Sequence, residues 1–224
     1  MFKSELDLQL TFYEQLVKSK TVSTNILQEF NARFGNVDIV EVNFNDLNVT
    51  LTREQAEILS LYSSALVVGF LHKNTPRTYK YLISKTGYTK DYLNSILLTL
   101  EKEKIISKLQ NNKYIICKDF EFPNLKFIAY ELKLRDWKKA IIQASKNTNF
   151  AYKSFVVMPN DEAIKIKEKY SEMFYLYNVG LIGVTNNTNY HYISPKITKH
   201  TYSISPTFIS STAKCILKEE FQAI

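Results

Sequence analysis

The sequence predicts an α/β fold that is interrupted by an inserted, mainly helical segment. After residue 119, short apolar strand patterns alternate with helical patterns, which is the order typical of α/β folds. Before residue 48, a helical pattern precedes two short strand patterns. Residues 48–118 between these parts have mostly helical apolar spacing. The 224 residues are enough for one large domain or two small ones.

Residues 1–47, the first part of the α/β region, are predicted to form one helix and two strands. Four apolar residues recur at helical spacing and predict a helix in the first twenty residues: Leu6, Leu10, Tyr13 and Val17. Residues 26–30 and 37–42 predict two strands joined at Gly35 or Asn36. The second strand places the carboxylate of Asp38 inside a strongly β-prone run.

The inserted segment, residues 48–118, predicts three helices followed by a hairpin. The first is a long helix with an apolar stripe made of Ala56, Leu59, Leu66 and Phe70. Thr75 and Pro76 predict the start of the second helix, and Gly87 predicts its end. The third begins near Thr89, ends at Lys104 and has the stripe Leu93, Ile96, Leu97 and Leu100. Residues 105–117 predict a β-hairpin that turns at Asn111 and Asn112.

This order of elements resembles a winged helix-turn-helix. In that fold the third helix enters the DNA major groove and the hairpin contacts the backbone. The residues expected to bind DNA are Lys85, Lys90, Tyr92, Asn94, Lys108 and Lys113. The alternative is a small helical insertion that contacts another protein.

The second part of the α/β region begins after residue 119. Its strands are expected at residues 126–134, 155–158 and 179–184. Its helices are expected from Asp136 to about residue 146 and at residues 161–174. The resulting division is residues 1–47 and 119–190 for the α/β core, 48–118 for the insertion, and 191–224 for a tail with a helix at 208–221.

Charge and composition limit the classes of function. The net charge is +7, and it is concentrated in residues 76–118 at +6 and residues 126–153 at +5. Two basic segments favour contact with a polyanion, although excess lysine also keeps proteins dispersed. Cys117 and Cys215 lack partners at metal-ligand spacing, so neither a disulfide nor a zinc site is expected. No apolar run is long enough to span a membrane and the N-terminus lacks the pattern of a signal peptide, which predicts a cytoplasmic protein.

The segment after residue 126 carries the clearest chemical signal. Glu131 and Lys133 are two residues apart on a predicted strand, so they project from the same face. Tyr130, Leu132 and Leu134 project from the other face. Burying an acid and a base together is costly unless a metal ion or a substrate phosphate satisfies them.

These residues resemble the PD-(D/E)XK nuclease superfamily, which has the restriction-endonuclease-like fold, a mixed sheet flanked by helices. The resemblance rests on Glu131-Leu-Lys133 after an apolar strand, and on the following helix with Trp137 and Gln143. Asp38 matches the strand acid of the family, and Glu5 resembles the helical glutamate of its resolvase-like branches. The sequence departs from the family in the long separation of Asp38 from Glu131, and in Val37, which stands where the motif has proline.

The resemblance implies a metal-dependent DNA endonuclease. Asp38 and Glu131 are then the ligands of Mg²⁺, or of Mn²⁺, and Lys133 orients the attacking water or stabilises the charge of the transition state. Gln143 faces the active cleft, and Glu5 is the additional acid, with Glu14 as its alternative. DNA is the expected partner, and both a monomer and a homodimer remain open.

Each site residue also has a purely structural interpretation. Glu131 and Lys133 can form a simple ion pair, and Asp38 can be a turn residue at a strand end. Gln143 can be a solvated helix residue, and Glu5 an exposed helical charge. At the level of the whole chain, the alternatives are a non-catalytic DNA-binding regulator that uses the fold for dimerisation or docking, and a protein-interaction module.

Overall fold

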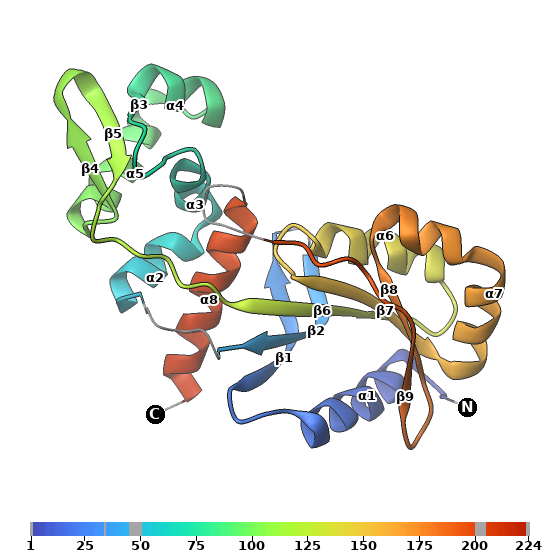
Figure 1. The fold of residues 1–224 in the computed structure, drawn as a ribbon. Helices are drawn as coiled ribbons and strands as arrows, with labels where there is room; N and C mark the ends of the chain where they lie inside the picture. The colour runs from blue at the N-terminus through green and yellow to red at the C-terminus, as the bar shows by residue number, and fades with distance from the viewer. Residues whose placement is uncertain (1, 34, 45–50, 200–204, 223–224) are drawn as a thin grey trace. The chain divides into compact units, whose positions relative to one another are not determined.

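The computed structural model describes residues 2–33, 35–44, 51–199 and 205–222 and divides the chain into two compact units. Unit 1 contains Met1–Asp46 and Leu125–Lys199, and unit 2 contains Leu47–Asn124 and His200–Ile224. The chain therefore leaves unit 1 after its second strand and returns to it at the third (Figure 1).

Unit 1 is built on a mixed sheet of six strands in the order β1-β2-β6-β7-β8-β9. The strands are β1 (Thr24–Ala32), β2 (Gly35–Asn43), β6 (Lys126–Leu132), β7 (Lys153–Pro159), β8 (Gly180–Val184) and β9 (Asn189–Ile193). Strand β6 pairs parallel with β7, and β7 pairs parallel with β8. The other neighbouring pairs, β1 with β2, β2 with β6, and β8 with β9, are antiparallel. The predicted α/β class is confirmed, with a mixed sheet flanked by helices.

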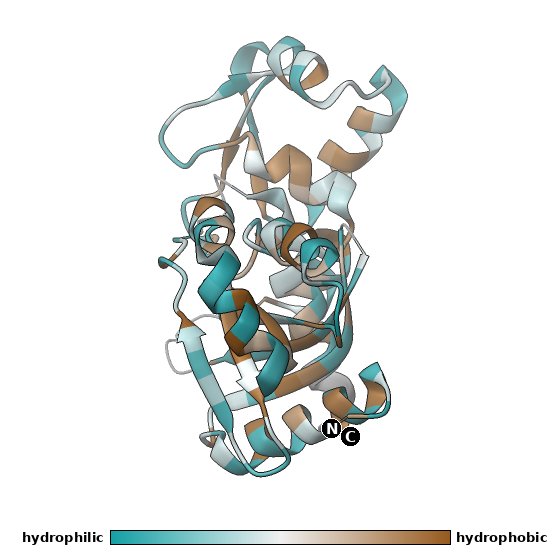
Figure 2. Cartoon of the chain, turned by 90° about the vertical axis from the view of Figure 1, so that its right-hand side faces the viewer, coloured by the Kyte–Doolittle hydropathy of each residue, from teal (hydrophilic) through white to brown (hydrophobic). Residues whose placement is uncertain are grey.

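Helices cover both faces of this sheet. One face carries α1 (Glu5–Ser19), whose buried side chains pack with Ile39, Tyr130 and Val157. The other face carries α6 (Trp137–Asn147) and α7 (Asn160–Tyr177), which pack with Val156 and Leu181 (Figure 1). In Figure 2 much of the sheet is brown, for hydrophobic residues, whereas the edge strand β9 is mostly pale or teal.

The helix predicted in the first twenty residues is confirmed as α1, but most of the apolar residues whose spacing predicts it lie on its exposed side. Leu6 is 62% exposed, and Leu10 and Val17 are also exposed. The buried face instead consists of Leu8, Phe12 and Leu16. Both sets of residues recur at helical spacing. They lie on nearly opposite sides of the helix, because their members are two positions apart. The sheet buries the set that contains the phenylalanine, whose ring contacts Tyr130 edge-on.

Unit 2 combines helices with a three-stranded sheet in the order β3-β5-β4. Its elements are α2 (Arg53–Ser60), α3 (Tyr62–Gly69), β3 (Arg77–Thr78), α4 (Tyr79–Thr86), α5 (Lys90–Lys102), β4 (Ile106–Leu109), η1 (Gln110–Asn112), β5 (Lys113–Ile116) and α8 (Pro206–Gln222). Leu59, Leu82, Leu93 and Ile116 belong to its hydrophobic core. The core also includes Ile209, Ala213 and Ile216 of α8, so the C-terminal helix belongs to this unit.

Several local predictions in unit 2 are confirmed. Gly87 ends α4 with a left-handed backbone, and Thr89 caps α5. The predicted stripe of α5 is buried. Asn111 and Asn112 turn the hairpin with positive φ angles, which asparagine tolerates better than most residues.

Two local predictions in unit 2 were wrong. The long helix is interrupted at Leu61, whose extended backbone separates α2 from α3. The cap of α4 is Thr78 instead of Thr75. Arg77 and Thr78 first pair with β5, so the helix begins only after that short strand. Among the described residues, no helix is long and apolar enough to cross a membrane.

Candidate active site

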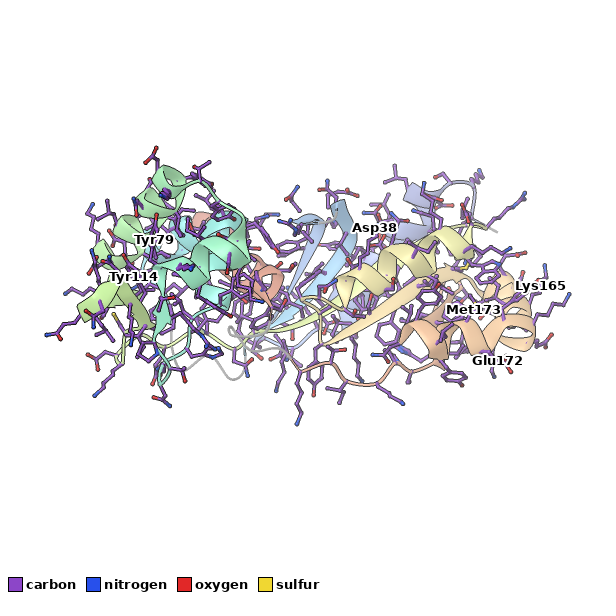
Figure 3. The ribbon with its side chains drawn as sticks, turned by 90° about the horizontal axis from the view of Figure 1, so that it is seen from above. Asp38, Tyr79, Tyr114, Lys165, Glu172 and Met173 are labelled. Atoms are coloured by element: carbon purple, nitrogen blue, oxygen red, sulfur yellow. The ribbon has the colours of Figure 1, made fainter. Side chains whose placement is uncertain are left out.

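Asp38 and Glu131 come together through the pairing of β2 with β6. Ile39 lies opposite Tyr130 in this antiparallel pair, and the same register continued by one residue brings Asp38 opposite Glu131. The backbone N–H of Leu132 donates to Asp38 Oδ2 at 2.6 Å. The two acids therefore occupy the same region of unit 1, although unit 2 separates them in the sequence. Figure 3 labels Asp38 on β2.

Glu131 is a buried carboxyl with one unused oxygen. Its exposed fraction is 2%, and its Oε1 accepts a hydrogen bond of 2.7 Å from the side-chain amide of Asn147. Its Oε2 is buried, with no hydrogen-bond partner among the described residues. Burial, with a smaller contribution from the charge of Asp38, raises the pKa of Glu131 to about 7. A cation close to Oε2 would satisfy this oxygen and favour the ionised form.

Asp38 is also held in a partly desolvated position. Burial raises its pKa above the ordinary value, and the N–H of Leu132 and the charge of Lys133 oppose this shift. The structural alternative of a turn residue does not apply, because Asp38 lies inside β2.

Lys133 directly follows β6, where the sequence predicted that it would lie within the strand. Its N–H donates to Val157 O at 3.1 Å, which continues the pairing with β7 by one residue. Its Nζ lies 2.8 Å from Leu132 O, 3.2 Å from Glu5 Oε2 and 3.9 Å from Asp38 Oδ2. The ion pairs of Lys133 in the described chain are thus with Glu5 and Asp38, and none joins it to Glu131.

Glu5 reaches this site from the first turn of α1. The helix starts here because the side chain of Ser4 accepts a hydrogen bond from the N–H of Asp7. Glu5 remains about half exposed, but its ion pair with Lys133 distinguishes it from a simple surface charge. Among the described residues, the alternative acid Glu14 forms no hydrogen bond or ion pair with Asp38, Glu131 or Lys133.

Two amide side chains of α6 share the face that contacts Glu131. Gln143 and Asn147 are one helical turn apart, and Asn147 holds Glu131. Gln143 Oε1 is buried and has no hydrogen-bond partner within the described part of the chain, which disagrees with a solvated role. The sequence interpretation missed Asn147, because it ended the helix one residue too early.

Glu29 was also missed. The register of β1 and β2 brings it opposite Asp38, between the pairs Gln28–Ile39 and Phe30–Val37. Its φ of 49° interrupts the pairing at that point. Its charge contributes to the raised pKa values of Asp38 and Glu131. The predicted junction of the two strands at Gly35 or Asn36 was wrong, because both residues lie in β2 opposite Ala32 and Asn31. A turn at Gly35 would have placed Asp38 opposite Ala32 instead of Glu29.

The predicted DNA-binding residues all belong to unit 2. Lys85 lies on α4, Lys90, Tyr92 and Asn94 lie on α5, and Lys108 and Lys113 lie on the two hairpin strands β4 and β5. All six are exposed. Lys108 and Lys113 are held close together, because Lys113 pairs with Leu109 in the hairpin. The side chains of the candidate active site belong to unit 1.

The carboxylate oxygens of Asp38 and Glu131 suit a hard divalent cation whose remaining coordination positions are filled by other oxygens. In the described residues, no group of three or more His, Cys, Asp or Glu side chains lies in position to hold a metal ion. Mg²⁺ usually binds one or two carboxylates and takes its other ligands from water and substrate phosphates. Asp38 and the unused oxygen of Glu131 fit that requirement.

Comparisons with known proteins identify no relative. No family model matches the chain, and no curated protein or solved structure matches it.

Proposed function

We propose that the protein is a Mg²⁺-dependent DNA endonuclease, with the chemistry in unit 1 and DNA recognition in unit 2. The observation that supports this most is Glu131, which lies opposite Asp38 and is a buried carboxyl whose second oxygen has no hydrogen-bond partner in the part of the chain that the structure describes. A buried carboxyl oxygen that binds no donor or cation lowers the stability of the fold. The resemblance to PD-(D/E)XK nucleases supplies the reaction class.

Each residue of the site has a distinct part in this proposal. Asp38 and Glu131 hold the ion, which when bound polarises the phosphodiester and lowers the pKa of the attacking water. Lys133 supplies a positive charge to the phosphate oxygens as negative charge builds up on them. Glu5 positions the Lys133 ammonium, and Asn147 fixes the orientation of Glu131.

Unit 2 supports the DNA-binding half of the proposal through its topology and charge. Its order α3, β3, α4, α5, β4, β5 is the order of a winged helix-turn-helix, with α5 as the helix that reads bases. Residues 76–118 carry a net charge of +6, which favours phosphates. Asn94 on the exposed side of α5 has an amide suited to an adenine edge.

The experiment is a cleavage assay of the full chain on duplex, branched and single-stranded DNA with Mg²⁺, Mn²⁺ or EDTA. We expect cleavage of at least one DNA with either metal ion and none with EDTA. Asp38→Asn should abolish it. Glu41→Gln is the matched control, because Glu41 is a half-buried acid on the same strand that bonds Tyr130 instead.

The non-catalytic regulator makes the opposite prediction in the same assay. A chain that binds DNA tightly but cleaves none of these substrates with either ion would support that alternative. It would leave the buried oxygen of Glu131 without a chemical role.

A further inference from the structure

Unit 1 contains a cavity of about 670 Å³ beside the candidate active site. It lies at the carboxyl ends of the parallel strands, where Leu134 follows β6, Pro159 ends β7 and Val184 ends β8. Glu5 lines the cavity and also contacts Lys133 at 3.2 Å, so the cavity adjoins the site. Its volume is in the range of sites for small molecules.

The walls of this cavity combine apolar surface with neutral hydrogen-bonding groups. Phe2, Leu134, Pro159 and Val184 are its apolar lining residues; Phe2 and Leu134 are partly buried and also pack against the core of unit 1. Asn186 and Asn187, both exposed in the loop between β8 and β9, supply amides that can donate and accept. Such walls suit a flat heteroaromatic ring that carries donors and acceptors on its edge.

The charges of the cavity argue against a phosphate as the occupant. Two cations, Lys3 and Arg135, are outnumbered by the acids Glu5, Asp136, Asp161 and Glu162. Asp136 is already used to cap α6, and Glu162 pairs with Lys165, which is labelled in Figure 3. The excess of acid repels a phosphate but leaves a neutral base unaffected.

We infer that this cavity receives an unpaired nucleobase of the strand that is cut. The inference rests on the proposed function and adds its substrate class: DNA in which a nucleotide next to the scissile phosphate is single-stranded or turned out of the duplex. The Phe2 ring stacks on the base, and the amides of Asn186 and Asn187 bind its edge. The sugar-phosphate backbone then passes Glu5 and Lys133.

The test is a cycle of binding measurements on the full chain in EDTA, so that no strand is cut. Fluorescence anisotropy gives Kd for a short oligothymidylate and for the same strand with abasic residues. We expect the bases to tighten binding by about tenfold in the wild type and to have little effect in Phe2→Ala, because base stacking on an aromatic ring is of that size. Tyr175→Ala is the control, since Tyr175 is an exposed aromatic residue that does not line the cavity.

A second variant protects the test against misfolding of Phe2→Ala. Asn186 and Asn187 are exposed, so the double change Asn186→Ala and Asn187→Ala should fold normally and reduce the difference in Kd between oligothymidylate and oligoadenylate. An equal Kd for the normal and abasic strands, or a base effect that survives in both variants, would overturn the inference. Displacement of the strand by free thymidine monophosphate with comparable affinity would also overturn it, in favour of a free nucleotide.

Failure of the proposed function gives a different result. If no DNA is cleaved with Mg²⁺ while the base effect still depends on Phe2, the base site stands and the nuclease assignment fails.

Discussion

The charged groups of the candidate active site in unit 1 differ in burial from the lysines of unit 2 that are expected to bind DNA. In unit 1, Glu131 and Lys133 are largely buried, and their side chains contact Asn147 and Glu5. In unit 2, Lys90 and Lys113 are exposed. Burying a charge costs free energy, whereas an exposed lysine costs little and still attracts an anion over a distance. This difference supports the proposal that unit 1 positions groups for chemistry and that unit 2 contributes affinity.

The largest effect short of removing a carboxylate is expected from Lys133→Ala. Loss of one charge that stabilises the transition state should lower the cleavage rate by about 10²–10³-fold. Mn²⁺ affinity, measured by calorimetry, should stay close to that of the wild type, because Lys133 is not a proposed ligand. Lost metal affinity would instead mean that Lys133 mainly keeps the two acids in place.

A change confined to unit 2 should affect binding without affecting the chemistry. Lys90→Ala combined with Lys113→Ala should weaken DNA binding by about tenfold and lower the slope of log K against log salt by about two. The cleavage rate at saturating enzyme should be unchanged. An unaltered salt slope would favour a protein-contact role for unit 2.

A third prediction concerns the pH dependence of stability. The pKa of Glu131 is raised in the folded chain to about 7 from 4.5, so the folded state holds this proton more tightly than the unfolded state. The resulting stability is fully present below about pH 4.5 and is lost as the pH rises to about 7. Glu131→Gln should therefore be more stable than the wild type by about 1–3 kcal/mol near pH 8.

Urea denaturation in EDTA measures this difference in the free energy of unfolding. Near pH 4.5 the two proteins should differ much less, and the matched variant Glu41→Gln should show a weaker pH dependence. If Glu131→Gln has the same relative stability at both pH values, Glu131 is not the buried, protonated group described above.

The smallest effect is expected from Glu29→Gln. Removing this charge should lower the pKa of Glu131 slightly, because the charge of Glu29 contributes to raising it. The acid limb of the pH–rate profile should move down by about a few tenths of a pH unit. A loss of activity comparable to that of Lys133→Ala would show that Glu29 takes a direct part in the reaction.

Local signals in the sequence predicted much of the fold. Gly87, Thr89 and the pair Asn111 and Asn112 mark turns and caps whose chemistry is contained in a few residues. The strand that holds Asp38 was also predicted from local residues, since its valines and isoleucine favour β structure.

Features that depend on distant contacts were not predicted. β3 exists only because β5 pairs with it, and the choice of the buried face of α1 depends on the sheet. β9 was not predicted as a strand, because residues 189–193 are mostly polar and form the edge of the sheet. The position of Glu29 required the register of β1 and β2, and the role of Asn147 required the packing of α6 against β6.

In the proposed function Glu131 serves chemistry and DNA affinity lies elsewhere, and one experiment measures both on the same DNA. The single-turnover cleavage rate with Mg²⁺ and the Kd in EDTA are determined for the wild type and Glu131→Ala. We expect the rate to fall by about three orders of magnitude or more, with Kd changed by less than about twofold, because the variant loses a metal ligand but no DNA contact. Cleavage at the wild-type rate, or a loss of DNA binding that accounts for the whole loss of cleavage, would contradict this role of Glu131.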